Sequence, residues 1–347
     1  MLLEPTIRPS PEPSGPAGVP AERRPAASAP GLVADGPEPG DGSVLDDGTV
    51  LADASVVVED VGRRRSPGLS PSRANDFLQC PLLFRFRVVD RRPEPPSAAA
   101  VRGTLVHSVL ERLFDVPSGR RDLVAAKALL DPCWAAMTAA QPDCANVLEG
   151  TTDLDAFFGA AAALLETYFT LEDPNRLQPA DRELVVRTDL EDGLELRGIV
   201  DRIDVAPDGA IRIVDYQTGK SPRAGYESAA LFQMRFYALV VSRLRGRVPA
   251  MLQLVYLGDG TLVRHVPDVG EIAATEKRIR ALWGGIRSTA EQDSWAPRPT
   301  ALCGWCSHKA LCPAFGGTAP QADPDAVERA IGVRPLLASG ALKPEGS

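Results

Sequence analysis

Several features that would place this chain in other classes are missing from its sequence. It contains no run of about eighteen apolar residues, so no segment is typical of a transmembrane helix. No apolar stretch follows a basic segment at the start of the chain, which predicts that this start is not a secretory signal. We therefore expect a cytoplasmic protein that does not have a membrane as a partner.

Aromatic side chains are absent from residues 1–65, which are rich in proline, glycine, alanine and acidic residues. Such a segment cannot bury enough apolar surface to offset the entropy lost on ordering, so we expect a disordered tail. Residues 1–60 contain eleven acidic residues and three arginines, which accounts for the whole net charge of −8. The rest of the chain is neutral on balance, so the acidic total does not exclude a polyanionic partner.

A phosphate-binding loop is also missing, although Gly219, Lys220 and Ser221 resemble the end of one. That loop requires a glycine five residues before its Gly-Lys-Ser group, and Val214 occupies this position. The sequence therefore argues against ATP binding through this motif.

The pattern of apolar residues predicts helices first, then strands, then a mixture of both. Helical spacing occurs from Ser70 to about Cys80 and in five longer segments: 97–114, 121–139, 153–171, 228–245 and 270–288. Alternating, β-branched segments predict strands at 182–190, 194–206, 210–217, 250–258 and 262–267. Turns are expected at Glu191-Asp192-Gly193 and Pro207-Asp208-Gly209. This order predicts one α/β domain with an added helical region.

Two aspartates lie late in neighbouring predicted strands. Asp201 is in the second strand and Asp215 is in the third, so a tight turn between antiparallel strands brings their carboxylates to one end of the sheet. Paired carboxylates suit Mg²⁺ or Mn²⁺. Alternation places Gln217 on the same face as Asp215. Surface aspartates near turns are common, so from these residues alone a pair of solvated side chains is an open alternative.

The residues around these aspartates belong to a longer series of sequence motifs. The segments "SPSRANDFLQCP", "RGTLVHSVLE", "GIVDRID", "DYQTGK", "QMRFY" and "CGWCSHKALCP" occur in this order between about Ser70 and Phe315. Together they resemble the RecB-type branch of the PD-(D/E)XK nuclease superfamily, which includes the Cas4 proteins and the AddB nuclease domain. The resemblance implies a restriction-endonuclease-like core, a central mixed sheet flanked by helices, and a metal-dependent nuclease.

The resemblance also implies a metal site. His107, on a helix, would bind the metal together with Asp201 and Asp215, and the backbone carbonyl of Tyr216 would join them. A lone histidine on a helix is otherwise most often a satisfied core or surface residue, and the surrounding motif is what favours the ligand here.

Substrate contacts are implied for the helix that follows. Gln233 and Tyr237, four residues apart on one helix face, match the Gln-x-x-x-Tyr motif and would orient the substrate phosphate. The alternative is an amphipathic helix with polar edges. Where the family has a catalytic lysine, this chain has Gln217, which can donate a hydrogen bond but carries no charge. Lys220, three residues further on, is the candidate to replace that lysine, although a lysine in a turn is usually solvated.

The cysteines predict a second metal centre. Cys303, Cys306 and Cys312 have C-x2-C-x5-C spacing, and the fourth ligand would be Cys80, far upstream. This arrangement resembles the [4Fe–4S] staple that ties the two ends of the nuclease domain together in AddB and Cas4 proteins. A zinc site that uses His308 in place of Cys80 is the alternative.

Two functions are consistent with these residues. The first is a metal-dependent DNA exonuclease or single-strand nuclease of repair or recombination, which acts on DNA ends or single strands and works with a helicase or another repair protein. The second is a degenerate nuclease fold that binds DNA ends or a partner without cleavage. The expected organisation is a tail at 1–65, a nuclease domain at 66–317 and a flexible C-terminal tail at 318–347 that contains a short helix at 323–332.

Overall fold

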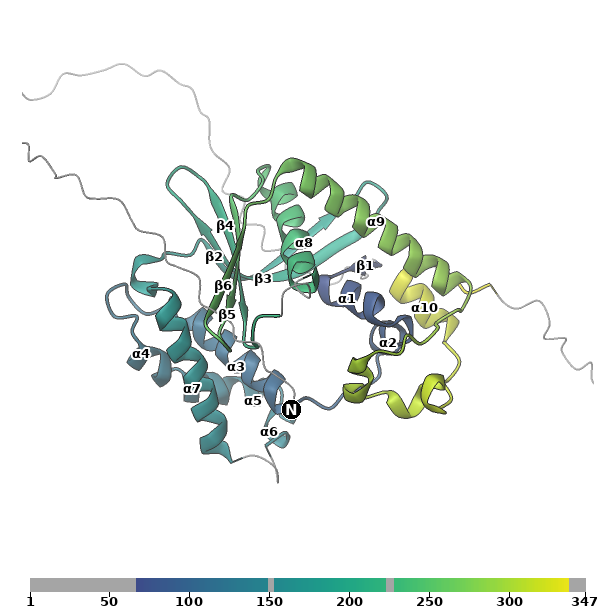
Figure 1. Cartoon of the computed structure of the whole chain (residues 1–347), viewed down its shortest axis with the longest axis horizontal. Helices are drawn as coiled ribbons and strands as arrows, with labels where there is room; N and C mark the ends of the chain where they lie inside the picture. Colours follow the sequence, from purple (N-terminus) through teal and green to yellow (C-terminus); the bar gives the residue numbers. More distant parts are fainter. Residues whose placement is uncertain (1–66, 149–152, 223–227, 337–347) are drawn as a thin grey trace, which may run out of the picture. The chain divides into compact units, whose positions relative to one another are not determined.

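The computed structural model describes residues 67–148, 153–222 and 228–336, and the predicted disordered tail at 1–65 lies outside these residues. One six-stranded mixed sheet lies at the centre of the described domain (Figure 1). Its strands are β1 (Gly68–Leu69), β2 (Asp181–Asp189), β3 (Glu195–Val205), β4 (Ile211–Gln217), β5 (Met251–Tyr256) and β6 (Thr261–His265). The predicted α/β class, with a mixed sheet flanked by helices, is confirmed.

Strand β3 is the longest strand and organises the sheet. It pairs antiparallel with β2 over most of its length, and on its other edge it pairs with β1 at its start and with β4 at its end. β4 then pairs parallel with β5, which pairs antiparallel with β6. The functional consequence is that the ends of β2, β3 and β4 lie next to one another.

The sheet is covered on both faces, and β4 shows how its residues are divided. Ile211 and Ile213 belong to one apolar cluster, whereas Val214 and Tyr216 belong to another, as expected from alternation along a strand. The first cluster is built with α1 (Pro71–Gln79), α2 (Pro81–Phe84), α8 (Ser228–Arg245), α9 (Val269–Glu291) and α10 (Pro324–Ile331). The second is built with α3 (Ala98–Leu113), α4 (Leu123–Ala128), α5 (Leu130–Ala140), α6 (Asp143–Asn146) and α7 (Leu154–Leu171).

The helix predicted at 121–139 is divided into α4 and α5. Pro132 lies in the first turn of α5, where its missing N–H and its ring prevent continuation of the preceding helix. Short elements that periodicity did not predict connect the larger ones. They are the π-helix η1 (Arg85–Val89) and the 3₁₀ helices η2 (Pro174–Arg176), η3 (Ala301–Trp305), η4 (Lys309–Leu311) and η5 (Pro313–Phe315).

The prediction of a flexible tail from residue 318 is wrong for the described part of that segment. Helix α10 packs against α9 and η1, and Ala322, Val327, Ile331 and Val333 are buried in the first apolar cluster. Residues 337–347 lie outside the described part. The apolar side chains of this segment are few, but they repeat at helical spacing and therefore form a buried stripe.

Two helical segments pass a composition test for membrane spans: 123–140, which covers α4 and α5, and 154–171, which is α7. This is weak evidence, because core helices often pass the same test. Both segments contribute side chains to the second apolar cluster, and 22% of each segment is buried in the domain. The expectation that the protein has no membrane partner stays a prediction.

Candidate metal centre

Three carboxylates lie in one row across the ends of β2, β3 and β4. The β2–β3 register pairs Arg182 with Arg202 and Leu184 with Val200, so Glu183 stands opposite Asp201. Continuing the β3–β4 register by one step from Arg202 and Val214 places Asp201 opposite Asp215. Directly opposed residues point to the same face of a sheet, so the three acids are neighbours for a purely geometric reason.

Glu183 was not among the predicted site residues, although the sequence contains the signal that finds it. The turn centred on Asp192 joins β2 and β3, and counting outward from it by equal steps pairs Glu183 with Asp201. Glu183 also has φ 45°, in the left-handed region that costs a non-glycine residue about 1–3 kcal/mol. The regular pairing of the two strands is interrupted at this position. Such local strain is characteristic of functional sites.

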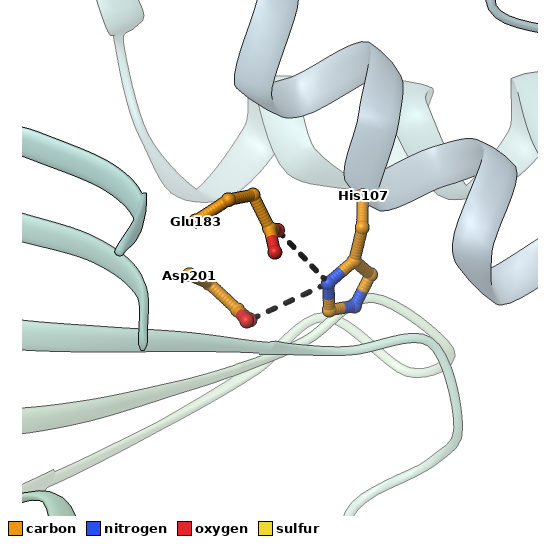
Figure 2. A group of neighbouring side chains, drawn as sticks. All are labelled: His107, Glu183 and Asp201. Atoms are coloured by element: carbon orange, nitrogen blue, oxygen red, sulfur yellow. Dashed lines mark ion pairs between the residues drawn. The ribbon is translucent and has the colours of Figure 1, made fainter. Parts of the chain in front are cut away.

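Helix α3 supplies the imidazole that completes the group. His107 Nδ1 lies 3.5 Å from Asp201 Oδ2 and 3.8 Å from Glu183 Oε1, and Figure 2 shows the ring pointing between the two carboxylates. One ligand atom from each of these three residues lies within 4.8 Å of the others. Gly103, one turn earlier in α3, allows the helix to approach β4, because a Cβ there would lie 3.1 Å from Thr218 Oγ1. The structure therefore brings together two of the predicted ligands, His107 and Asp201.

The backbone of Tyr216 faces the same site. Its N–H donates to Asp201 Oδ2 at 2.7 Å, so a side chain replaces the strand partner at the point where the β3–β4 pairing ends. The next carbonyl, that of Gln217, accepts from Leu257 N on the β5 side. Because successive residues of a strand present their backbone groups to opposite sides, the carbonyl of Tyr216 is directed to the side of β3, as a ligand role requires.

Two amides hold the carboxylate of Asp215. Gln217 Nε2 donates to Asp215 Oδ2, and Gln233 Nε2, from α8, donates to Asp215 Oδ1 at 2.7 Å. Asp215 is 2% exposed and is not part of the group within 4.8 Å that His107 and Asp201 form. Gln217, which occupies the position of the family's lysine, is thus hydrogen-bonded to Asp215.

Tyr237, the other residue of the predicted phosphate-binding pair, is buried. It is 7% exposed, and its ring lies against Gly198 of β3, where an added Cβ would be 2.6 Å from the ring. It interacts with Gln233, and burial raises the pKa of its hydroxyl. In this arrangement Tyr237 and Gln233 form a chain of contacts that ends at Asp215, rather than an open pair on the surface.

The protonation of the site reflects mutual repulsion between its acids. Burial, and then the negative charge of Asp215, raise the pKa of Asp201 to about 8. Burial also raises the pKa of Asp215, although the amides of Gln217 and Gln233 oppose this change. Burial would lower the pKa of His107, but its interactions with Glu183, Asp201 and Asp215 raise it to about 9.

These properties fit a divalent cation. Burial raises the pKa of both Asp201 and Asp215 even though the protonated imidazole of His107 opposes this, so the carboxylates lack enough positive charge to favour their ionised form. Hard oxygen ligands with one imidazole are a donor set that Mg²⁺ and Mn²⁺ accept. A cation among His107, Glu183 and Asp201, with Asp215 beside it, would supply the missing charge.

Lys220 lies just beyond β4 in a loop that is fixed on both sides. Ser221 N and Oγ donate to Asp259 Oδ2 at 2.9 and 2.6 Å, and Gly258 N donates to Gly219 O at 3.1 Å. Lys220 itself is exposed, and in the described part of the chain no hydrogen bond or ion pair joins it to the site acids. The structure does not bring Lys220 into the group.

A buried charge network supports the strands behind the site. Arg202, 1% exposed, donates to both oxygens of Glu172 at 2.8 and 3.0 Å, pairs with Asp204 at 3.1 Å and donates to the Tyr216 hydroxyl. Its guanidinium also lies 5.7 Å from the centre of the Phe114 ring. This network anchors β3 and β4 to one another immediately beside Asp201 and the backbone of Tyr216.

The four predicted cysteine ligands line one pocket in another part of the domain. All four line the same pocket: Cys80 follows α1, Cys303 lies in η3, Cys306 follows η3, and Cys312 follows η4. Backbone amides approach two of the sulfurs: Arg298 N lies 3.4 Å from Cys80 Sγ, and Thr300 N lies 3.3 Å from Cys303 Sγ. Among the described residues these thiols do not converge as closely as the group around His107 does.

Comparison with known proteins identifies the family of this chain. The model of the PD-(D/E)XK nuclease superfamily matches residues 68–313. The Gene 69 protein of Mycobacterium phage D29 is 26% identical over 199 residues, which cover 52% of this chain and 71% of that protein.

Two solved structures were also compared. A candidate exonuclease from Eubacterium rectale shares 13% identity at a TM-score of 0.47, over 70% of this chain and 87% of that one. The protein SSO0001 shares 15% identity at a TM-score of 0.34, over 73% and 89%. Because the family match covers well over half of the residues and includes all four elements that carry the site, this chain belongs to the PD-(D/E)XK nuclease superfamily.

Proposed function

We propose that this protein is a Mg²⁺- or Mn²⁺-dependent nuclease of the RecB type that hydrolyses phosphodiester bonds in DNA, as an exonuclease or single-strand nuclease in repair or recombination. Membership of the superfamily implies a nucleic-acid substrate. The observation that carries the proposal is the convergence of His107, Glu183 and Asp201, with Asp215 adjacent, at the ends of three neighbouring strands. DNA ends or single strands are the proposed substrate, and a helicase or another repair protein is the proposed partner.

Each residue has a distinct role in this proposal. His107, Glu183 and Asp201 hold the cation, and Asp215 and the carbonyl of Tyr216 complete its surroundings. A divalent cation in this position supplies positive charge for the phosphate and for the charge that develops on it during cleavage. Gln217 and Gln233 fix both oxygens of Asp215, so that the carboxylate keeps one orientation.

Gln217 limits the expected rate. An amide can donate to an attacking water, but it adds no positive charge beside the phosphate. In the structure one N–H of its amide donates to Asp215. We therefore expect a slow nuclease. This same residue is the observation that favours the second candidate, a DNA-end or partner binding module without cleavage.

For the cysteines, we propose a structural [4Fe–4S] cluster. Cys80, Cys303, Cys306 and Cys312 line one pocket, and thiolates that receive backbone amides suit such a cluster. The alternative zinc site needs His308, whose Nε2 lies 2.8 Å from Glu94 and whose ring contacts Phe86. A carboxylate beside one ring nitrogen is compatible with zinc binding through the other, so zinc stays the alternative, and the four-thiolate set rests on the pocket that the four cysteines share.

The test is cleavage of labelled single-stranded and duplex DNA by anaerobically prepared protein in Mg²⁺ or Mn²⁺. We expect slow digestion that stops on chelation of the metal and in the Asp201→Ala protein. Asp189→Ala, an exposed aspartate of β2, is the matched control and should digest DNA at the parental rate. If the parent binds DNA ends but digestion stays at the level of Asp201→Ala, the binding module is the correct function.

A further inference from the structure

The segment that carries three of the cysteines also exposes large apolar side chains. Trp305 is 88% exposed, Leu302 is 54% exposed and Phe315 is 45% exposed. By contrast, Trp283 and Trp295 are 8% and 6% exposed. A tryptophan is usually well buried, because it is the side chain with the most apolar surface to remove from water. The exposure of Trp305 therefore needs an explanation.

The cysteine pocket does not provide that explanation. The pocket is lined by the cysteines, with Phe86, His308 and Phe315 among the other side chains, but Trp305 and Leu302 do not line it. None of the residues of η3 is buried, so this turn presents Trp305 outward while Cys303 and Cys306, on either side of it, face the pocket. The pocket fixes the backbone around the indole, and the indole itself faces solvent.

The charged residues of the same segment indicate which kind of molecule this surface could bind. Between Asp293 and Asp323 the sequence contains no acidic residue, whereas it contains the exposed Arg298 and Lys309. The ammonium of Lys309 lies 4.9 Å from the centre of the Phe315 ring. The acid that approaches from a neighbouring element, Glu94, is occupied by His308 and Arg87. Both cations also line the cysteine pocket, and Arg298 donates to the carbonyl of Leu78. The surface thus combines an exposed aromatic plane with two cations that form no ion pair with a carboxylate among the described residues.

We propose that the surface formed by Trp305, Leu302, Phe315, Lys309 and Arg298 is a binding site for single-stranded nucleic acid, in which a base stacks on Trp305 and the cations meet the adjacent phosphates. Unstacked bases present flat apolar faces joined by a polyanionic backbone, which is the chemistry that this surface complements. A duplex, whose bases are stacked internally, does not offer such a face. The proposal rests on the proposed function, since it adds to the nuclease a site that holds the strand away from the metal centre.

The test measures affinity by fluorescence anisotropy, with fluorescein-labelled oligothymidine and the Asp215→Ala protein, which is not expected to cleave it. Trp305→Ala should weaken binding about fivefold to 150-fold, the range that removal of one base-stacking aromatic produces. Trp305→Phe keeps an aromatic plane and should retain most of the affinity. Val124→Ala, at another exposed apolar position, is the control and should leave the affinity unchanged.

Salt dependence separates stacking from charge. Lys309→Gln should reduce the slope of log affinity against log salt by about 0.7, the value for one phosphate contact on a single strand. Trp305→Ala should reduce the affinity without changing that slope. Iron content and the unfolding midpoint should be the same in all of these proteins, because Trp305 and Lys309 are exposed.

The proposal is overturned if Trp305→Ala binds oligothymidine as tightly as its parent, or if the parent binds duplex DNA but no single strand. It is also overturned if Trp305→Ala changes only self-association in sedimentation, which would assign the surface to a protein contact. The proposed nuclease function is judged separately, by metal-dependent cleavage in a protein with Asp215 intact. Failure of one therefore does not imply failure of the other.

Discussion

Replacement of Arg202 by methionine should remove a large part of the stability of the domain. Methionine keeps most of the length of the side chain but leaves Glu172, 7% exposed, without its cation, whereas Asp204, 15% exposed, keeps a salt bridge to Arg212 at 2.7 Å. It also removes the donor to the Tyr216 hydroxyl and the contact with the Phe114 ring. Breaking a buried ion pair from one side typically costs about 3–5 kcal/mol, a third or more of the stability of many domains.

Urea denaturation followed by circular dichroism measures this loss. If the unpaired charge of Glu172 is the main cause of this loss, replacing Glu172 by Gln as well should recover part of it. The free energy of unfolding of the double variant Arg202→Met/Glu172→Gln should then exceed the value expected from adding the two single effects by about 0.5–3 kcal/mol. Arg334→Met removes an exposed arginine with two carboxylate partners and should leave the unfolding midpoint unchanged within error. A loss below about 1 kcal/mol for Arg202→Met would refute the assignment of a buried network.

The pH dependence provides a second measure of the same pair. Burial raises the pKa of Glu172, but the hydrogen bonds and charge of Arg202 outweigh it and hold the pKa below its usual value of 4.5. A lowered pKa stabilises the folded state above pH 4.5, and this stabilisation is lost as the pH falls through the folded value. In Arg202→Met only the hydrogen bond from Gln253 and the charge of Arg212 still oppose burial, so the pKa of Glu172 rises above its value in the parent and protonation becomes more favourable. The difference in stability between the two proteins should therefore shrink as the pH falls toward 4.5.

Three further results are expected. Gln217→Lys should raise the cleavage rate about ten- to a thousandfold in quenched time courses, because it adds a charge beside the phosphate, and the gain should vanish when Asp215 is also alanine. Mn²⁺ affinity, measured by calorimetry, should rise as the pH increases through 8 and 9, since Asp201 and His107 must lose protons to bind it; a flat profile would contradict the assigned ligands. Anaerobic protein should contain roughly four irons per chain, and Cys80→Ser should lose them; stoichiometric zinc without iron would refute the cluster.

The sequence predicts the elements of this fold well because their patterns are local. Alternation identified β2 to β6 but missed β1, whose two residues are too few to show a pattern. The turns at Asp192 and Asp208 joined β2 to β3 and β3 to β4. The break at Pro132 was also visible in the sequence, and it was missed because the apolar period continues across it. The packing of α10 depends on its contacts with α9 and η1, which are far from it in the sequence, so a local sequence pattern could not predict this packing.

The site was predicted in part. His107, Asp201 and Asp215 were identified through the resemblance, and the structure places the two aspartates on neighbouring strands and His107 of α3 beside Asp201. Glu183 was missed because a single acid in a strand looks like a solvated edge residue, and only the register of β2 against β3 reveals its position. The contacts of Gln217 could not be predicted, because the hydrogen bond that it makes depends on rotamers rather than on spacing.

Helix α10 affects where the protein can be shortened. The superfamily match ends at residue 313, so a truncated protein that stops there would seem to keep the whole nuclease domain. Yet Val327, Ile331 and Val333 lie beyond it with at most 8% of their surface exposed, and each buried side chain of this size contributes about 1.5–3 kcal/mol. Their removal would uncover apolar surface on α9 and η1 and favour aggregation. A proteolytic fragment that resists digestion is therefore expected to end after Val333.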